Sequence, residues 1–247
     1  MKPVIWKTTL STAPSDLLFG PDGAERPLEV RRSPTARRMK LSVDPRNGAV
    51  VLSLPKRASL KPALVWAEAN RGWIDAALAK LPEERPILAG GTVPYEGEPL
   101  LIDWQPDRTR TVRHEPGRLV FGGPAESVST RVLGWLRRQA RETLERETRE
   151  IAAIAGVSIA GVAVADPRAR WGSCSAEGDI RYSWRLIMAP AFGRRSTVAH
   201  EVAHRVHMDH SPAFHRLAKD LLGSDPALAR AWLRREGSAL HWVGRGS

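Results

Sequence analysis

Residues 196–214 read STVAHEVAHRVHMDHSPAF, and five of the chain's seven histidines lie within residues 200–215. The segment from His200 to His204 has the form H-E-x-x-H. Residues four apart share one face of a helix, so His200 and His204 can offer two imidazole nitrogens to one tetrahedral Zn²⁺. Glu201 is offset by one position, so its carboxylate can act as the general base on a zinc-activated water instead of binding the metal.

A catalytic zinc needs a third protein ligand, and two candidates follow from the sequence. His210 lies six residues after His204 and would point away from the metal on a continuing helix. Ser211 and Pro212 form an N-cap and a first-turn proline, which predict that the first helix ends near 207 and that His210 lies in a turn before a new helix. This turn favours His210. The alternative is a downstream carboxylate, for which Glu236 is the only later glutamate.

The pattern on either side of this stretch predicts an α+β fold. Ser196 is the expected cap of the metal-binding helix. A long helix over 127–155 ends at Gly156, where a left-handed cap belongs. Two strands, 158–165 and 180–188, flank a polar loop at 170–175. Upstream, we expect a hairpin (39–43 with 50–54) turning at Asn47-Gly48, a helix over 59–80, and short strands around 93–95, 100–104 and 119–121.

These elements predict three segments. Residues 1–28 are an irregular lead-in, residues 29–123 a β-rich N-terminal region, and residues 124–247 a zincin-like metallopeptidase domain made of a long helix, a small sheet and an active-site helix. The boundary at 123 rests on the break Gly122-Gly123-Pro124.

Composition limits the partners and the compartment. The 247 residues are 42% hydrophobic and carry a net charge of +11 from 31 Arg and 7 Lys against 27 acidic residues. This excess divides into +5 over residues 1–125 and +6 over 126–247, so we interpret it as an Arg-rich composition and keep nucleic acid only as an alternative partner. One cysteine, Cys174, excludes a disulfide framework. The first 15 residues lack a signal-peptide core and no apolar run is long enough for a membrane span, so we expect a cytoplasmic protein.

Several motifs resemble those of the YgjP-like zinc metallopeptidases, a family related to the WLM and SprT-like proteases. The resemblance is specific from about 168 to 214 and looser over the rest of the chain. It implies a zincin fold, a single Zn²⁺ per chain bound by His200, His204 and His210, and Glu201 as catalytic base. His215 stands where the family usually has Trp. The motifs are 171–175 (WGSCS), 178–180 (GxI), 184–190 (WRLxxAP), 200–204 (HExAH) and 207–214 (HMDHSPxF).

The remaining site residues stay open. Cys174 as a fourth ligand would close the metal site, and a small buried side chain beside the metal-binding helix is the favoured reading. A peptide substrate would add to an edge strand, for which 180–185 is the best guess by position. The candidates for stabilising the oxyanion or contacting substrate are Arg170, Ser173, Tyr182, Arg185 and His207.

Two functions therefore compete. The first is a zinc-dependent metallopeptidase that hydrolyses polypeptides through a zinc-activated water, with Glu201 as general base. The alternative is a nucleic-acid-associated protein whose zinc site cuts bound proteins or is inert.

Overall fold

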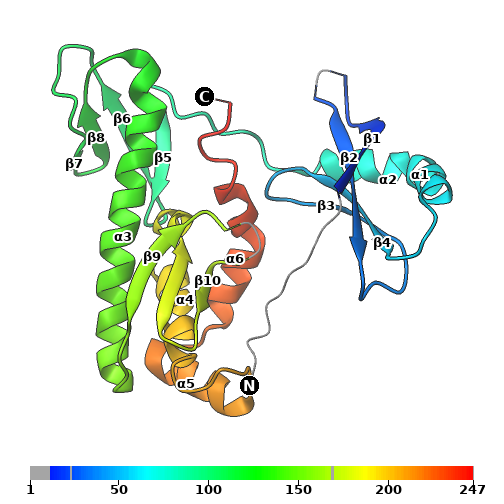
Figure 1. The fold of residues 1–247 in the computed structure, drawn as a ribbon. Coiled ribbons are helices and arrows are strands. Elements are labelled where there is room, and N and C mark those ends of the chain that lie inside the picture. The colour runs from blue at the N-terminus through cyan, green and yellow to red at the C-terminus, as the bar shows by residue number, and fades with distance from the viewer. Residues whose placement is uncertain (1–11, 23, 168–169, 247) are drawn as a thin grey trace. The chain divides into compact units, whose positions relative to one another are not determined.

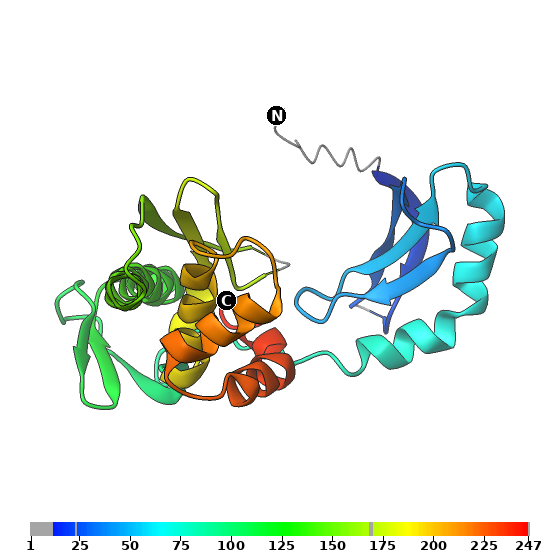
Figure 2. The same ribbon diagram turned by 90° about the horizontal axis from the view of Figure 1, so that it is seen from below.

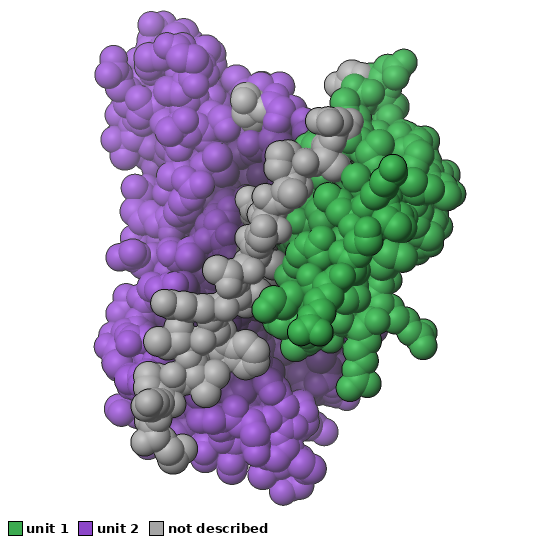
Figure 3. Space-filling model, turned by 45° about the vertical axis from the view of Figure 1, so that its right-hand side comes forward, with its two compact units in different colours: residues 1–82 green, residues 83–247 purple. Residues whose placement is uncertain are grey.

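The computed structural model describes residues 12–22, 24–167 and 170–246 and divides the chain into two compact units, 1–82 and 83–247 (Figure 3). The expected boundary at 123 differs from this division. Val93 and Phe121, from strands before residue 123, share one hydrophobic core with Trp135 and Leu136 of the following helix. Residues 83–123 therefore belong with the second unit, and Gly122-Gly123-Pro124 is a turn inside it.

The first unit is a four-stranded sheet with two helices on one face (Figure 2). Its strand order is β1-β2-β4-β3, with β2 parallel to β4 and the other pairs antiparallel. The expected hairpin is confirmed as β3 and β4. The elements are β1 (Thr12–Phe19), β2 (Arg26–Ser33), β3 (Lys40–Val43), β4 (Val50–Pro55), α1 (Leu60–Ala69) and α2 (Arg71–Leu78).

Two expectations for this unit were wrong. Residues 12–28 are not an irregular lead-in, because they hold β1 and the start of β2, and Phe19 and Leu28 are buried in the core. Residues 1–11 of the expected lead-in lie outside the described residues. The helix expected over 59–80 is two helices, because the chain bends at Asn70, whose side-chain amide donates to the Trp66 carbonyl at 2.7 Å.

The second unit combines two small sheets with four helices, and α3 runs along its length (Figure 1). The sheet order is β5-β6-β8-β7 in one sheet and β10-β11-β9 in the other. The elements are β5 (Thr92–Tyr95), β6 (Glu98–Trp104), β7 (Arg113–Glu115), β8 (Arg118–Phe121), η1 (Ala125–Ser127), α3 (Val128–Ala155), β9 (Gly161–Ala165), β10 (Gly172–Cys174), β11 (Asp179–Ser183), η2 (Trp184–Met188), α4 (Ala191–Ala203), α5 (Pro212–Leu222) and α6 (Ala227–Leu240).

The long helix and its left-handed end are confirmed, since Gly156 follows α3 with φ 66°. The strand expected over 180–188 is shorter. It ends at Ser183, whose hydroxyl accepts a hydrogen bond from the Arg185 amide at 3.3 Å and begins the 3₁₀ turn η2. The metal-binding helix also begins earlier than the expected Ser196 cap, at Ala191 after Pro190.

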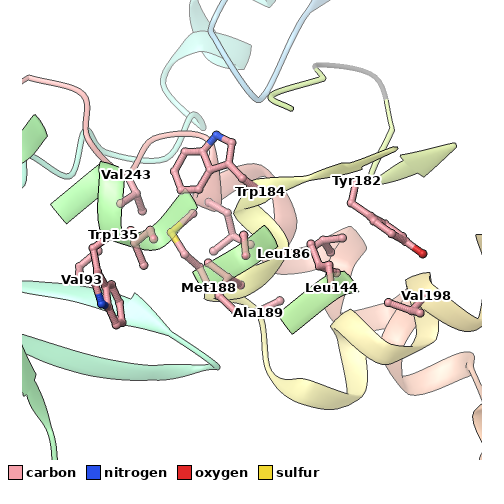
Figure 4. Close-up of a cluster of buried hydrophobic side chains, with 14 of the residues drawn as sticks. Val93, Trp135, Leu144, Tyr182, Trp184, Leu186, Met188, Ala189, Val198 and Val243 are labelled. Atoms are coloured by element: carbon pink, nitrogen blue, oxygen red, sulfur yellow. The ribbon is translucent and has the colours of Figure 1, made fainter. Parts of the chain in front are cut away.

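The core of the second unit lies between α3 and the segment from β11 to α4. Tyr182, Trp184, Leu186 and Val198 are at most 2% exposed, and Figure 4 shows them with Leu144 and other buried side chains. The mixed α+β fold is therefore confirmed. In the described part of the chain, no helix has the length and apolarity needed to cross a membrane.

Candidate metal centre

The first two histidines stand at the end of α4. His200 lies in its last turn, and His204 follows Ala203, the last residue of the helix. The His204 Nδ1 atom lies 3.0 Å from the His207 carbonyl oxygen. Because a carbonyl oxygen can only accept, Nδ1 must carry the proton, and Nε2 keeps its lone pair for a metal. The backbone of His207 thus orients the second candidate ligand.

The turn expected before His210 is present and brings this residue back to α4. Residues 204–206 form a turn, and α5 begins at Pro212 with Ser211 as N-cap, whose hydroxyl accepts from the Phe214 amide at 3.4 Å. The Nε2 atoms of His210 and His200 are 3.2 Å apart. The competing candidate, Glu236, lies on α6 and accepts from the Arg235 guanidinium at 2.6 Å.

The donor set fits a catalytic zinc. One nitrogen from each of His200, His204 and His210 lies within 4.8 Å of the others. Zn–N bonds of about 2.0–2.1 Å in a tetrahedron separate two ligand nitrogens by about 3.4 Å, close to the spacing of His200 and His210. Among the described His, Cys, Asp and Glu residues, no fourth side chain joins this group, and the Cys174 thiol faces the Ser175 carbonyl at 3.3 Å. Three ligands and an open position are typical of a catalytic site.

The Phe214 ring packs against all three imidazoles. This ring is fully buried, and its centroid lies 4.8, 4.5 and 4.8 Å from those of His200, His204 and His210. Ring packing of this kind holds the imidazoles in fixed orientations and limits their loss of entropy on binding a metal. His215, the departure from the family pattern, is exposed, and its ring centroid lies 6.1 Å from that of His210.

Glu201 is the buried acid of the site. It is 5% exposed, and burial raises its pKa to about 7, although the positive charge of Arg170 acts in the opposite direction. It lines a cavity of about 300 Å³ together with the three histidines, Arg170, Gly172, Ser173, Cys174 and Met208. A carboxylate with a pKa near neutrality can both take up and release a proton at neutral pH, which is what a general base and acid needs.

Gly172 is where β10 meets this carboxylate. A Cβ atom at position 172 would lie only 2.6 Å from Glu201 Oε1 and 2.8 Å from its Cδ, so any larger residue here would force the Glu201 side chain or the strand to shift. The sequence marked Gly172 as part of a family motif without this role. Its contact restricts the Glu201 carboxylate from the strand side.

β10 and β9 are the two outer strands of this sheet and β10 is the one that contacts α4, so the expectation that 180–185 forms the edge strand was wrong. β11 is the central strand of its sheet, because β10 pairs with one side and β9 with the other. The Ser183 amide donates to the Trp171 carbonyl and the Ser175 amide to the Asp179 carbonyl. Alternation along an antiparallel ladder then directs the backbone groups of Gly172 and Cys174 away from β11.

The five candidates for substrate or oxyanion contacts separate into two groups. Arg170 and Ser173 line the cavity. Tyr182 is fully buried, and its hydroxyl meets Thr148 Oγ1 of α3 at 3.0 Å. The Arg185 guanidinium binds Asp166 at 2.8 and 3.0 Å and the Leu240 carbonyl at 2.7 Å. His207 contributes its carbonyl, as described above. Tyr182 and Arg185 were chosen for chemistry compatible with the site, but both side chains are engaged elsewhere.

The sequence also gave no indication of the ion pair behind α4. Arg194, six residues before His200, donates to Glu147 of α3 at 2.9 and 3.2 Å, and both side chains are at most 4% exposed. Glu96 adds a second carboxylate at 3.1 Å. The bidentate pair fastens the metal-binding helix to α3. Their burial depends on contact between residues 47 apart in the chain, which local patterns do not show.

Comparison with models of known protein families gives a match over most of the chain. Residues 37–236 match the model of a family described as YgjP-like, metallopeptidase domain. Searches of curated proteins and of solved structures returned no significant match.

Proposed function

Because the chain belongs to the family of YgjP-like metallopeptidase domains, we propose that it is a zinc-dependent peptidase with His200, His204 and His210 as metal ligands. The observation that carries this proposal is the convergence of three imidazole nitrogens beside one buried carboxylate, Glu201, in a single cavity. Bound zinc would act as a Lewis acid that polarises the scissile carbonyl and lowers the pKa of a water molecule.

Glu201 is the proposed general base. Its carboxylate takes the proton of the attacking water and then delivers that proton to the leaving amine. Arg170 is the proposed donor to the developing oxyanion, since it lines the cavity and its charge acts on Glu201. Ser173 is the second candidate, with a neutral hydroxyl in place of a charge.

The proposed substrate is an extended polypeptide paired with the free edge of β10. The outward backbone groups of Gly172 and Cys174 offer donors and acceptors to such a strand. A second hollow of about 660 Å³ shares Arg170, Ser173 and Cys174 with the metal cavity and extends along this sheet. It would give room for side chains on one side of the scissile bond.

The test measures the rate at which the protein hydrolyses an unfolded protein substrate and the zinc content of the same preparation. Wild-type protein should bind about one zinc per chain, as one three-histidine site requires. Glu201→Gln should keep this zinc and lose about 10²–10⁴-fold in kcat, the usual contribution of general acid–base catalysis. His210→Ala should lose zinc and activity together.

Glu236→Gln is the matched control, because it removes the alternative third ligand. It should retain both zinc and activity. Wild-type protein that binds no zinc in a zinc-replete buffer would overturn the proposal, and retained activity in Glu201→Gln would remove this residue from the mechanism.

A further inference from the structure

The positive charge of the chain is concentrated in the first unit. Residues 1–82 hold 14 Lys and Arg against 7 Asp and Glu, a net +7, whereas the twice longer second unit holds 24 against 20, a net +4. Counting the net charge over residues 1–125 and 126–247 concealed this difference, because that count placed segment 83–123 with the first unit, whereas it belongs to the second. The first unit therefore has a charge density several times that of the metal-binding unit.

Six of these cations gather at one end of the sheet. β2 and β4 are parallel, with Ser33 opposite Pro55, so both strands terminate at the same end of the sheet (Figure 1). β3 begins at this end, with Lys40 opposite Ser53. The loops at this end and the first turn of α1 supply the cations, all of them exposed. We call this set the basic surface: Arg37, Arg38, Lys40, Lys56, Arg57 and Lys61.

Acidic residues do not neutralise the basic surface. Between Glu29 and Glu68 the only acid is Asp44, and it bonds Arg46 at 2.8 Å at the opposite end of the β3–β4 hairpin. Within the described residues, no ion pair involves any of the six cations. Unpaired exposed cations give the surface a positive electrostatic potential, which raises the local concentration of a polyanion.

The loop after β4 is held in place by an arginine side chain of β2. The Arg32 guanidinium donates to the carbonyls of Lys56 at 2.9 Å and Ala58 at 2.8 Å. Helix α1 begins directly after this loop, so its first amides and the positive end of its dipole face the same end of the unit. Its N-cap residue, Ser59, makes no side-chain capping bond that would satisfy those amides. The cations of this loop are therefore presented on an ordered backbone.

We propose that the basic surface binds the phosphate backbone of double-stranded nucleic acid. Its three arginines suit phosphate, because the guanidinium fork matches phosphate oxygens, and the helix end adds backbone donors. None of its residues is aromatic, and binding of single strands usually stacks bases on aromatic rings. Met39 is the one large apolar side chain exposed in the two loops, which leaves little to insert into a lipid surface.

The experiment measures the affinity of the full chain for a short duplex DNA of mixed sequence as a function of salt. Six phosphate contacts predict that log K falls with log salt with a slope of about −5. The double variants Arg37→Glu with Arg38→Glu, and Lys56→Glu with Arg57→Glu, should each reduce the slope by about 2 and weaken binding by more than about tenfold near 0.1 M salt.

Two controls keep the test specific. Arg138→Glu with Arg141→Glu changes the charge equally on exposed positions of α3 in the other unit, and it should leave the slope unchanged. Arg37→Lys with Arg38→Lys keeps the charge and should retain most of the slope. Melting curves of all variants report whether they are folded.

The proposal fails if wild-type protein does not bind duplex DNA at about 50 mM salt, or if the α3 control loses as much affinity as the surface variants. It also fails if polyglutamate, or vesicles containing phosphatidylserine, bind as tightly as the duplex. Those results would identify an acidic protein or an anionic membrane as the partner. None of these outcomes depends on zinc or on peptidase activity.

Discussion

Substituting Gly172 by alanine tests whether the strand beside α4 positions Glu201, the proposed catalytic base. A Cβ atom would sit 2.6 Å from Glu201 Oε1, and ordinary contact begins at 3.4 Å, so the carboxylate or the strand must move by about 0.8 Å. Misplacing a catalytic group by about 1 Å commonly costs about 10²-fold in rate, or about 2.7 kcal/mol of transition-state stabilisation. We expect Gly172→Ala to lose about that much in kcat/KM, mainly in kcat.

The assay compares kcat and KM on an unfolded protein substrate with the zinc content of the same preparation. Zinc should stay at the wild-type level, because the three histidines lie on α4 and in the following turn and not on β10. Gly134→Ala is the matched control: an added Cβ on this exposed position of α3 meets no atom within 4 Å. It should keep full activity and gain about 1 kcal/mol in stability, since alanine favours a helix over glycine.

Two results would refute this reasoning. Wild-type activity in Gly172→Ala would show that the strand does not restrict Glu201. Loss of zinc together with activity would show that the contact supports the metal ligands instead of the base.

Three further predictions concern stability. Glu147→Ala leaves Arg194 buried with only Glu96 beside it, so it should lower the free energy of unfolding by about 3–5 kcal/mol and Tm by more than about 6 °C. The control Glu145→Ala breaks a surface ion pair and should lower the free energy of unfolding by less than about 1 kcal/mol. Equal Tm values for the two variants would contradict a structural role for the buried pair. Removing metal with a chelator should lower Tm, and zinc at about 100 times its Kd should restore about 2.7 kcal/mol; a Tm indifferent to zinc would argue against the three-histidine site. Burial raises the pKa of Asp166, but hydrogen bonds and charge from Arg185 outweigh it, so its net pKa is lowered from 3.8. Asp166 then stabilises the fold above about pH 4 and loses this effect as pH falls through its lower folded pKa, so urea titrations should show the stability gap between wild type and Asp166→Asn shrinking at acid pH; a constant gap would contradict the shift.

Local features were predictable from the sequence because they depend on residues close together in the chain. Helical periodicity places His200 and His204 on one face, and the Ser211-Pro212 start of α5 makes the turn that returns His210. The left-handed end at Gly156 and the Asn47-Gly48 hairpin follow from backbone sterics in the same way. The three histidines that converge and the buried Glu201 beside them were therefore predicted as a site without coordinates.

Predictions about neighbours across the fold were less successful, because hydrophobicity alone does not say which strand lies where. Residues 180–185 have the pattern of a strand, but only pairing with both β9 and β10 shows that β11 is central. Arg185 and Tyr182 have side chains suited to an oxyanion, yet Asp166 and Thr148 engage them. Of these partners, β9, Asp166 and Thr148 are distant in sequence and were invisible to local patterns.

The sequence by itself predicted the candidate metal ligands, the candidate base and the elements that carry them, since these depend on hydrogen bonds and sterics over a few residues. Tertiary structure decided the edge strand beside Glu201, the burial that raises its pKa, and the assignment of residues 83–123 to the metal-binding unit. It also decided where the positive charge gathers. These properties arise from contacts between segments far apart in the chain, whose free energy depends on how the whole core packs.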